Sequence, residues 1–290
     1  MGERELRSHV EDICAVSMFI DPEMWDMDRL QGKLEDYLAN SSARLDVVAE
    51  KFEELGYAPE YHDFTFYGRT ATNAVFRKRG SSARRKGRTC AGKELWLAGH
   101  HDHCAGLGAE DDASGLAVML GLARQFSDSP AVERLVFASF DLEERGMVGS
   151  SRYASSLTDA ELDSIDALVT LECLGSGKDL SLCESLYHTE CDPGLNSSIS
   201  SCAEKLDLSL LSDRYDFGSD AVPFSNRGVR ATNLCSLTSA YWRPYRQGRC
   251  DRDRVTVSHT ELDTPEHLDY ARMADAESII AELIRREYSS

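Results

Sequence analysis

The sequence predicts an α/β fold, a three-layer sandwich in which a mostly parallel, mixed sheet is flanked by helices. Two observations support this prediction. Short apolar segments alternate with longer amphipathic ones, which is the pattern of a parallel sheet covered on both faces. Hydrophobic residues make up 42% and charged residues 28%, as in an ordinary globular protein. No linker divides the chain, so we expect a single domain spanning residues 1–290.

The first 60 residues read as a helical segment. Between Met27 and Leu38, apolar residues recur with the 3.6-residue period of an amphipathic helix. The segment from Ser42 to Leu55 continues in the same way, and Gly56 suits a helix C-terminus. We therefore expect helices before the first strand.

Strands are expected from residue 61 onward. Residues 61–77 are rich in Phe, Tyr, Thr and Val and predict two early strands. Residues 78–92 are basic, contain Gly and Ser and show no periodicity, which predicts a mobile surface loop. A helix is predicted at residues 112–126. Further strands are predicted at residues 94–98, 134–140, 167–171 and 229–235.

Polar residues follow three of these strands at the point where each ends. His100 and Asp102 follow the first, Glu143 and Glu144 follow the second, and Glu172 follows the third. In open α/β sheets, ligands bind at the carboxyl edge of the strands. Imidazoles and carboxylates gathered at that edge indicate a metal site rather than core packing.

Composition limits the classes of partner. The chain has 32 basic and 50 acidic residues, a net charge of −18, which disfavours nucleic acid and anionic membranes. It lacks the apolar run of about 18 residues that a membrane span needs. The N-terminus has no secretory signal, and nine scattered cysteines suit reduced thiols. We therefore expect a cytoplasmic protein; nothing in the sequence sets its oligomeric state.

Each motif has an ordinary structural explanation when taken alone. The Asp111–Asp112 pair before Ala-Ser-Gly suits a helix N-cap, where free backbone amides stabilise an acidic side chain. Glu143–Glu144 suits a charged turn, and His259 suits a surface histidine. Cys104, four residues after His100, is expected to pack at the strand end rather than to bind metal. Together, however, the motifs supply the two imidazoles and several carboxylates that a two-zinc hydrolase needs.

Five motifs occur in a fixed order along the chain. They are Ala-Gly-His-His-Asp (98–102), Gly-Ala-Glu-Asp-Asp-Ala-Ser-Gly (108–115), Leu-Glu-Glu-Arg-Gly-Met-Val-Gly-Ser (142–150), Gly-Ser-Asp-Ala-Val-Pro-Phe (218–224) and His-Thr-Glu-Leu-Asp-Thr (259–264). This series resembles the zinc exopeptidases of peptidase family M28 in order and separation. The resemblance implies two zinc ions per chain. Asp111 would bridge them, His100 and Glu172 would complete one site, and Glu144 and His259 would complete the other.

The resemblance also implies a reaction. Such enzymes hydrolyse N-terminal residues from peptides or dipeptides by a water held between two zinc ions, with Glu143 as the general base. His100 would bind zinc through one ring nitrogen, and Asp102 would orient the imidazole through the other ring nitrogen. Asp263 would buttress the loop that carries His259.

The chain departs from the family pattern at two positions. Glu172 stands where Asp is usual, and its extra methylene would shift the metal that it binds. Glu110 stands where Asp or Asn is commoner, and we expect it outside the ligand set. Cobalt or manganese could replace zinc at His and carboxylate ligands.

Other functions are compatible with the same fold. A glutaminyl cyclase-like enzyme would bind one zinc ion, and an amidohydrolase would act on a non-peptide amide. A non-catalytic binding module would have no need of the complete set of ligands found here. Counting metal ions per chain separates hydrolase from cyclase.

The segment before His259 is the candidate substrate pocket. Tyr241 and Trp242 could form an apolar wall, while Arg243 or Arg246 could bind a substrate carboxylate. The alternative is an Arg-rich loop paired with surface acids.

Overall fold

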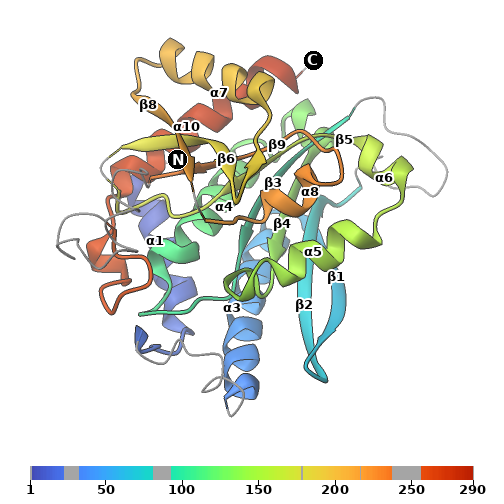
Figure 1. Cartoon of the computed structure of the whole chain (residues 1–290). Coiled ribbons are helices and arrows are strands. Elements are labelled where there is room, and N and C mark those ends of the chain that lie inside the picture. Colours follow the sequence, from blue (N-terminus) through green and yellow to red (C-terminus); the bar gives the residue numbers. More distant parts are fainter. Residues whose placement is uncertain are drawn as a thin grey trace.

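One sheet forms the centre of the molecule (Figure 1). The computed structural model describes residues 2–22, 33–80, 93–177, 179–215, 217–236 and 256–289. Within them, nine strands lie in the order β1-β2-β4-β3-β5-β9-β6-β7, with β8 paired to β6. The strands are β1 Tyr57–Phe66, β2 Arg69–Lys78, β3 Glu94–His100, β4 Leu135–Phe140, β5 Ile165–Leu171, β6 Leu180–Leu186, β7 Thr189–Glu190, β8 Leu210–Tyr215 and β9 Ala231–Cys235.

The helices are distributed along the whole described chain. Their bounds are α1 Glu3–Ala15, α3 Leu34–Glu54, α4 Ser114–Gln125, α5 Val148–Ser156, α6 Asp159–Ser164, α7 Pro193–Lys205, α8 Ala221–Ser225 and α10 Tyr270–Glu287. Short helical turns lie at η3 Ala109–Ala113, η4 Pro130–Arg134, η5 Glu143–Arg145 and η7 Pro265–His267. No helix within the described residues is both long and apolar enough to span a bilayer.

The centre of the sheet is parallel, and antiparallel pairs join it to its flanks, where β6 and β8 again run parallel. Strands β4, β3, β5 and β9 run parallel, while the hairpin of β1 and β2 joins β4 antiparallel and β6 joins β9 antiparallel. The mostly parallel, mixed sheet predicted from the sequence is therefore confirmed. The predicted strands correspond to β3, β4, β5 and β9 and to the early hairpin, whereas β6, β7 and β8 were not predicted.

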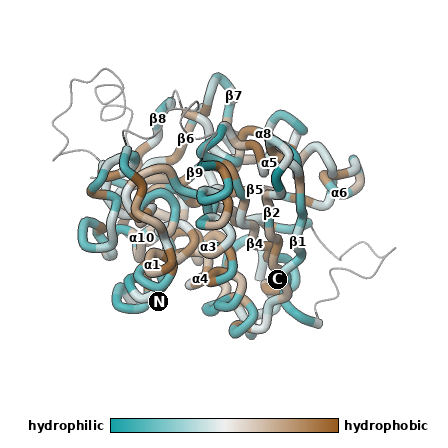
Figure 2. The backbone as a smooth tube through the Cα atoms, turned by 90° about the horizontal axis from the view of Figure 1, so that it is seen from below, coloured by the Kyte–Doolittle hydropathy of each residue, from teal (hydrophilic) through white to brown (hydrophobic). Residues whose placement is uncertain are grey.

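Helices cover both faces of the sheet (Figure 1). Residues on β3 alternate between two cores: Leu95 and Leu97 pack in the core that includes α1, α3, α4, α7 and α10, and Trp96 and Ala98 pack in the core that includes α5, α6 and α8. This alternation follows from the two-residue period of a strand. In Figure 2, hydrophilic residues predominate in the outer turns, and hydrophobic ones run along the inner strands and helix faces.

Of the two N-terminal helices, α3 packs against β1 and β2, whereas α1 packs against α4 and α10. Helix α3 covers the segment predicted from Ser42 to Leu55 as far as Glu54, and Leu55 is its C-cap, followed by Gly56 with φ of +80°. The predicted period from Met27 onward falls partly on residues 23–32, which lie outside the described part. Helix α4 is buried on all sides rather than on one face, with residues 114–123 all inaccessible.

Candidate metal centre

The candidate site lies at the carboxyl edge of the parallel strands. His100 is the last residue of β3, and Glu172 directly follows β5. The pair Glu143–Glu144 lies in η5, three residues beyond the end of β4. Since these strands are parallel neighbours, the polar residues that follow them meet at one edge of the sheet.

The turn before α4 directs two adjacent aspartates to different partners. The Asp112 carboxylate accepts hydrogen bonds from the His100 amide (3.3 Å) and the Gly115 amide (3.1 Å), so it holds the first turn of α4 to the end of β3. The peptide bond between Asp111 and Asp112 is cis. A Cβ atom at Gly115 would overlap the Leu171 carbonyl oxygen and crowd the Asp112 carboxylate, so this approach requires glycine.

Asp111 lies between two histidines. Its Oδ1 is 3.0 Å from His100 Nε2, and its Oδ2 is 3.2 Å from His259 Nε2. Oδ2 also accepts a hydrogen bond of 2.7 Å from the Ser258 hydroxyl. One carboxylate therefore faces two imidazoles through different oxygens, which is the arrangement that a bridging ligand needs.

Two groups of metal-competent side chains adjoin this carboxylate. In the first, His100, Asp111 and Glu172 each place one donor atom within 4.8 Å of the others, and all three are buried. The second contains Glu144 and His259, whose Oε2 and Nε2 atoms are 3.1 Å apart. Its third member is Cys104. The cysteine is buried as the sequence suggested, but it also lies beside these donor atoms.

Several buried nitrogen and oxygen atoms at this edge, all of a kind that binds metal, have no hydrogen bond among the described residues. Glu144 Oε1 and Glu172 Oε2 are two of them, and His100 Nε2 and Asp111 Oδ1 face each other without hydrogen-bond geometry. Buried polar atoms are nearly always hydrogen-bonded in native proteins. These unpaired nitrogen and oxygen atoms fit the donor set of zinc and similar dications.

The site concentrates negative charge in a buried space. Burial raises the pKa of Glu172 to about 8, with a further contribution from Asp111. Burial also raises the pKa of Glu143 well above its ordinary value, and the nearby Glu172 adds to this. Burial opposes the charged form of His100, but Asp102 and Asp111 raise its pKa well above the usual range. A dication would balance these carboxylates, so we expect metal binding to release protons.

Asp102 links the ends of β3 and β4. Its carboxylate accepts hydrogen bonds from the amides of Glu143 (3.1 Å) and Glu144 (3.2 Å) and from the Tyr37 hydroxyl (2.8 Å). His100 Nδ1 is 3.1 Å from the Asp102 carbonyl oxygen and 3.5 Å from its carboxylate. The orienting contact predicted for Asp102 is therefore made more closely by its backbone than by its side chain.

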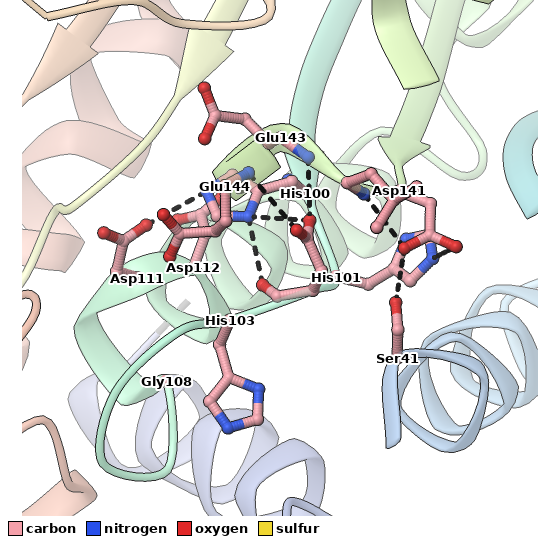
Figure 3. Close-up of polar contacts among 12 residues, drawn as sticks. Ser41, His100, His101, His103, Gly108, Asp111, Asp112, Asp141, Glu143 and Glu144 are labelled. Atoms are coloured by element: carbon pink, nitrogen blue, oxygen red, sulfur yellow. Dashed lines mark hydrogen bonds and ion pairs between the residues drawn. The ribbon is translucent and has the colours of Figure 1, made fainter. Parts of the chain in front are cut away.

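Glu143 is anchored by its backbone and leaves its carboxylate unused by this network. In Figure 3 the carboxylate points away from the hydrogen-bonded group, while the backbone nitrogen bonds to Asp102. The residue is 9% exposed. A buried carboxylate placed beside the ligands, but belonging to neither donor group, suits a proton acceptor.

Two other histidines, one in the first motif and one directly after it, have contacts elsewhere. His101 Nδ1 is 2.9 Å from the Ser139 hydroxyl, and His103 Nε2 is 3.0 Å from the Met18 carbonyl oxygen. Figure 3 shows His103 directed away from Asp111. Neither belongs to the two donor groups found among the described residues.

Asp263 fastens the loop that contains His259. Its carboxylate accepts a hydrogen bond of 2.5 Å from the Glu110 amide, and its carbonyl accepts one of 2.8 Å from the Leu107 amide. These bonds tie that loop to the turn before α4, in agreement with the predicted buttress. The Glu110 side chain instead accepts a hydrogen bond from Ser236 (3.2 Å), outside both donor groups.

Helix α3 holds the loop between β3 and η3 through a buried arginine. Arg44 is fully buried and donates to the carbonyl oxygens of His101 (2.7 Å), Leu107 (2.8 Å) and Gly108 (3.0 Å). Three groups on this helix therefore reach the site, since Tyr37 bonds to Asp102 and the Ser41 hydroxyl donates to Asp141 at 2.6 Å. The sequence did not predict these contacts.

Asp220 is a further buried acid, and its motif was recognised without a role. It precedes α8, is 1% exposed, and has its pKa raised to about 7 by burial. The negative charge of Asp220 is one of the causes that raise the pKa of Glu143 and the pKa of Glu172. Tyr241, Trp242, Arg243 and Arg246 lie outside the described residues.

Comparison with known proteins identifies the family. The model of peptidase family M28 matches residues 82–284. The chain belongs to peptidase family M28. All the proposed ligands of this M28 member fall inside the matched segment, whereas α3 precedes it.

Several known proteins are similar to this M28 member. Aminopeptidase YwaD of Bacillus subtilis is 28% identical over 191 residues, 64% of this chain and 39% of that protein. The structure of BSAP, a zinc aminopeptidase from Bacillus subtilis, aligns with a TM-score of 0.59 and 23% identity over 76% of this chain and 50% of that one. The chain thus spans at most half the length of these two aminopeptidases. Glutaminyl cyclase from Porphyromonas gingivalis aligns with a TM-score of 0.75 and 16% identity over 99% of this chain and 98% of that one. Both structural likenesses concern the fold alone.

Proposed function

We propose that this M28 member is a two-zinc metallo-exopeptidase that removes N-terminal residues from peptides or dipeptides. The observation that carries the proposal is the position of Asp111, whose two carboxylate oxygens face His100 and His259 separately. Each histidine has a second acidic neighbour, Glu172 in one group and Glu144 in the other. Two cations sharing Asp111 would use all five side chains.

The ligand roles follow from the two donor groups. His100, Asp111 and Glu172 would hold one ion, and Asp111, Glu144 and His259 would hold the other. When bound, the pair of ions would polarise the scissile carbonyl and lower the pKa of a water molecule.

Glu143 is the residue that moves the proton in this proposal. Its carboxylate accepts a proton from the attacking water and delivers it to the leaving amine. The hydrogen bond from its amide to Asp102 holds it next to Glu144. Burial, and then Glu172, raises the pKa of Glu143 above its ordinary value, so its carboxylate holds a proton more readily than an exposed glutamate does.

A buried acid outside the proposed ligand set also supports action at a free N-terminus. Asp220 is 1% exposed and lies close enough to Glu143 and Glu172 for their charges to influence one another. A substrate α-amine carries a positive charge that such an acid attracts. An acetylated N-terminus lacks that charge, so blocked peptides are expected to be poor substrates.

The proposal is tested by peptide hydrolysis with and without zinc. Chelated protein is mixed with a library of dipeptides and tripeptides before and after zinc is added, and mass spectrometry records which N-terminal residues are lost. Glu143→Gln should keep its zinc content and lose at least about 100-fold in turnover. Glu204→Gln, an exposed change on α7, is the matched control. Near-normal turnover by Glu143→Gln would remove the base assignment.

A second candidate is a glutaminyl cyclase-type reaction. The favouring observation is that this chain aligns end to end with Porphyromonas gingivalis glutaminyl cyclase, at 99% and 98% coverage. A peptide beginning with glutamine separates the two proposals. Loss of the first residue with two zinc ions per chain supports the exopeptidase, whereas loss of ammonia with one zinc ion supports the cyclase.

A further inference from the structure

Cys104 faces the second group of donor atoms. Its sulfur, a Glu144 carboxylate oxygen and a His259 ring nitrogen all lie within 4.8 Å of one another. The cysteine is 2% exposed. Among the described cysteines it alone belongs to either donor group. A cysteine that served only to fill the core would have no need of two polar neighbours.

The Glu144 carboxylate gives independent support for a ligand at this point. Its side chain is 4% exposed, and its Oε2 lies 3.1 Å from His259 Nε2. The other oxygen, Oε1, is buried and has no hydrogen bond among the described residues. An ionised carboxylate is seldom buried with one oxygen unused, because that leaves it without compensation for lost hydration.

The number of donors also favours a role for the sulfur. Asp111 reaches His259 through Oδ2, so Asp111, Glu144 and His259 supply three donors. Thiolate sulfur is one of the preferred donors of zinc. Cys104 would supply a fourth protein donor, and the water of the proposed mechanism would then make this zinc five-coordinate, as catalytic zinc sites can become.

We propose that Cys104 is a thiolate ligand of the metal ion held by Glu144 and His259. On binding, the thiol proton is released to solvent and a sulfur–metal bond replaces the S–H bond. A thiolate ligand favours zinc, cobalt or cadmium over manganese and magnesium, which prefer oxygen donors. The inference rests on the proposed metallopeptidase function and adds the metal preference of one site.

The loop geometry explains how the sulfur is positioned. Cys104 lies four residues after His100, in the loop whose carbonyl oxygens at Leu107 and Gly108 are bonded to Arg44. Gly106 has φ of +54°, and a Cβ atom there would crowd the Asp263 carbonyl oxygen. The loop therefore packs against the segment after His259, which brings the cysteine to that histidine.

Cobalt substitution tests the ligand directly. The full chain is chelated and then loaded with cobalt(II), and the bound cobalt per chain is measured. Visible bands report cobalt bound at either site, whereas a near-ultraviolet charge-transfer band reports a sulfur–cobalt bond. We expect two cobalt ions and the sulfur band in the unmodified protein. The band should disappear in Cys104→Ser and remain in Cys173→Ser, a buried cysteine beside Glu172.

Zinc affinity provides a second readout. Cys104→Ser should weaken zinc binding at one of the two sites by at least about tenfold, since even indirect partners of metal ligands contribute that much. Manganese affinity should change by a smaller factor, because manganese gains little from a thiolate. Equal losses for the two metals would contradict the proposed selectivity.

The outcomes separate this inference from the proposed function. Two cobalt ions without a sulfur band would overturn the ligand assignment and leave the two-metal hydrolase intact. One cobalt ion with the band would support Cys104 as a ligand and contradict the two-metal mechanism. No sulfur band with one or no bound cobalt ion would overturn both.

Discussion

Replacing Arg44 with methionine is expected to destabilise the protein more than most single substitutions. Arg44 is fully buried on α3 and donates three hydrogen bonds to backbone carbonyls of the loop after β3. Methionine fills much of the same volume, so the main change is the loss of those bonds rather than a cavity.

The magnitude follows from what each carbonyl retains. Among the described residues, the Gly108 carbonyl keeps its bond from the Ala113 amide (3.0 Å), and the Leu107 carbonyl keeps only the Cys14 thiol at 3.6 Å. Hydrogen bonds to a charged group contribute about 1.5–3 kcal/mol each. The substitution also removes the cost of burying a charged guanidinium, which offsets part of this loss. We therefore expect the free energy of unfolding to fall by roughly 3–6 kcal/mol. That is a large part of the roughly 5–15 kcal/mol by which domains are stable.

Urea unfolding in excess chelator measures this loss without a contribution from metal binding. The emission of the buried Trp96 reports the transition. Arg44→Lys should lose an intermediate amount, because one ammonium cannot reach all three carbonyls. Arg69→Met removes an exposed ion pair with Glu35 (2.7 Å) and should cost less than about 1 kcal/mol. A loss below about 1 kcal/mol for Arg44→Met would refute the reasoning.

Three further predictions concern packing, pH and metal. Gly115→Ala should lower the free energy of unfolding by about 2–3 kcal/mol because the added Cβ overlaps β5; Gly2→Ala, which meets nothing, is the control for urea unfolding. Burial lowers the pKa of His103 from 6.5 to about 3, and Asn40 donates a hydrogen bond to its unprotonated Nδ1. As the pH falls, this histidine therefore takes up a proton in the unfolded chain before it does so in the folded protein. The free energy of unfolding should therefore fall as the pH drops below 6.5, by up to about 1.4 kcal/mol per pH unit. The dependence of this free energy on pH should be shallower in His103→Gln than in the exposed control His188→Asn, and equal slopes would contradict the prediction. Chelation should lower the melting temperature by roughly 5–10 °C, as calorimetry would show, whereas an unchanged melting temperature would argue against metal binding.

The strands that the sequence predicted are those whose burial is visible in their composition. Residues 94–98 and 167–171 are nearly continuous apolar runs, because both of their faces are covered. Leu180–Leu186 was missed because Ser and Glu interrupt its leucines. Six of its seven residues are buried all the same, because β8 and β9 flank the strand and the Ser181 hydroxyl accepts a hydrogen bond from Tyr215. Tertiary packing overrides the local pattern there.

The proposed ligands could be named from the sequence because each follows a strand or belongs to a recognised motif. Cys104 and Arg44 could not, since their roles depend on how residues 101–108 fold back over the end of β3. That path is set by left-handed Gly106 and Gly108 and by the bridge between Ile20 and Gly106. No local pattern in the sequence encodes such a long-range return. The roles of the candidate pocket residues 241–246 stay predictions.

The contacts of helix α3 determine where this chain can be cut without disturbing the candidate site. The family match begins at residue 82, but the hydroxyls of Tyr37 and Ser41 and the guanidinium of Arg44 come from residues before it. Arg44 bonds to the loop backbone, and the two hydroxyls bond to the carboxylates of Asp102 and Asp141, so none of the three touches a proposed ligand atom. A fragment chosen by the family boundaries would contain every proposed metal ligand and the proposed base. It would lack the groups that keep the ligand-bearing loop in place, so excision at that boundary should yield a chain with the right chemistry and the wrong geometry.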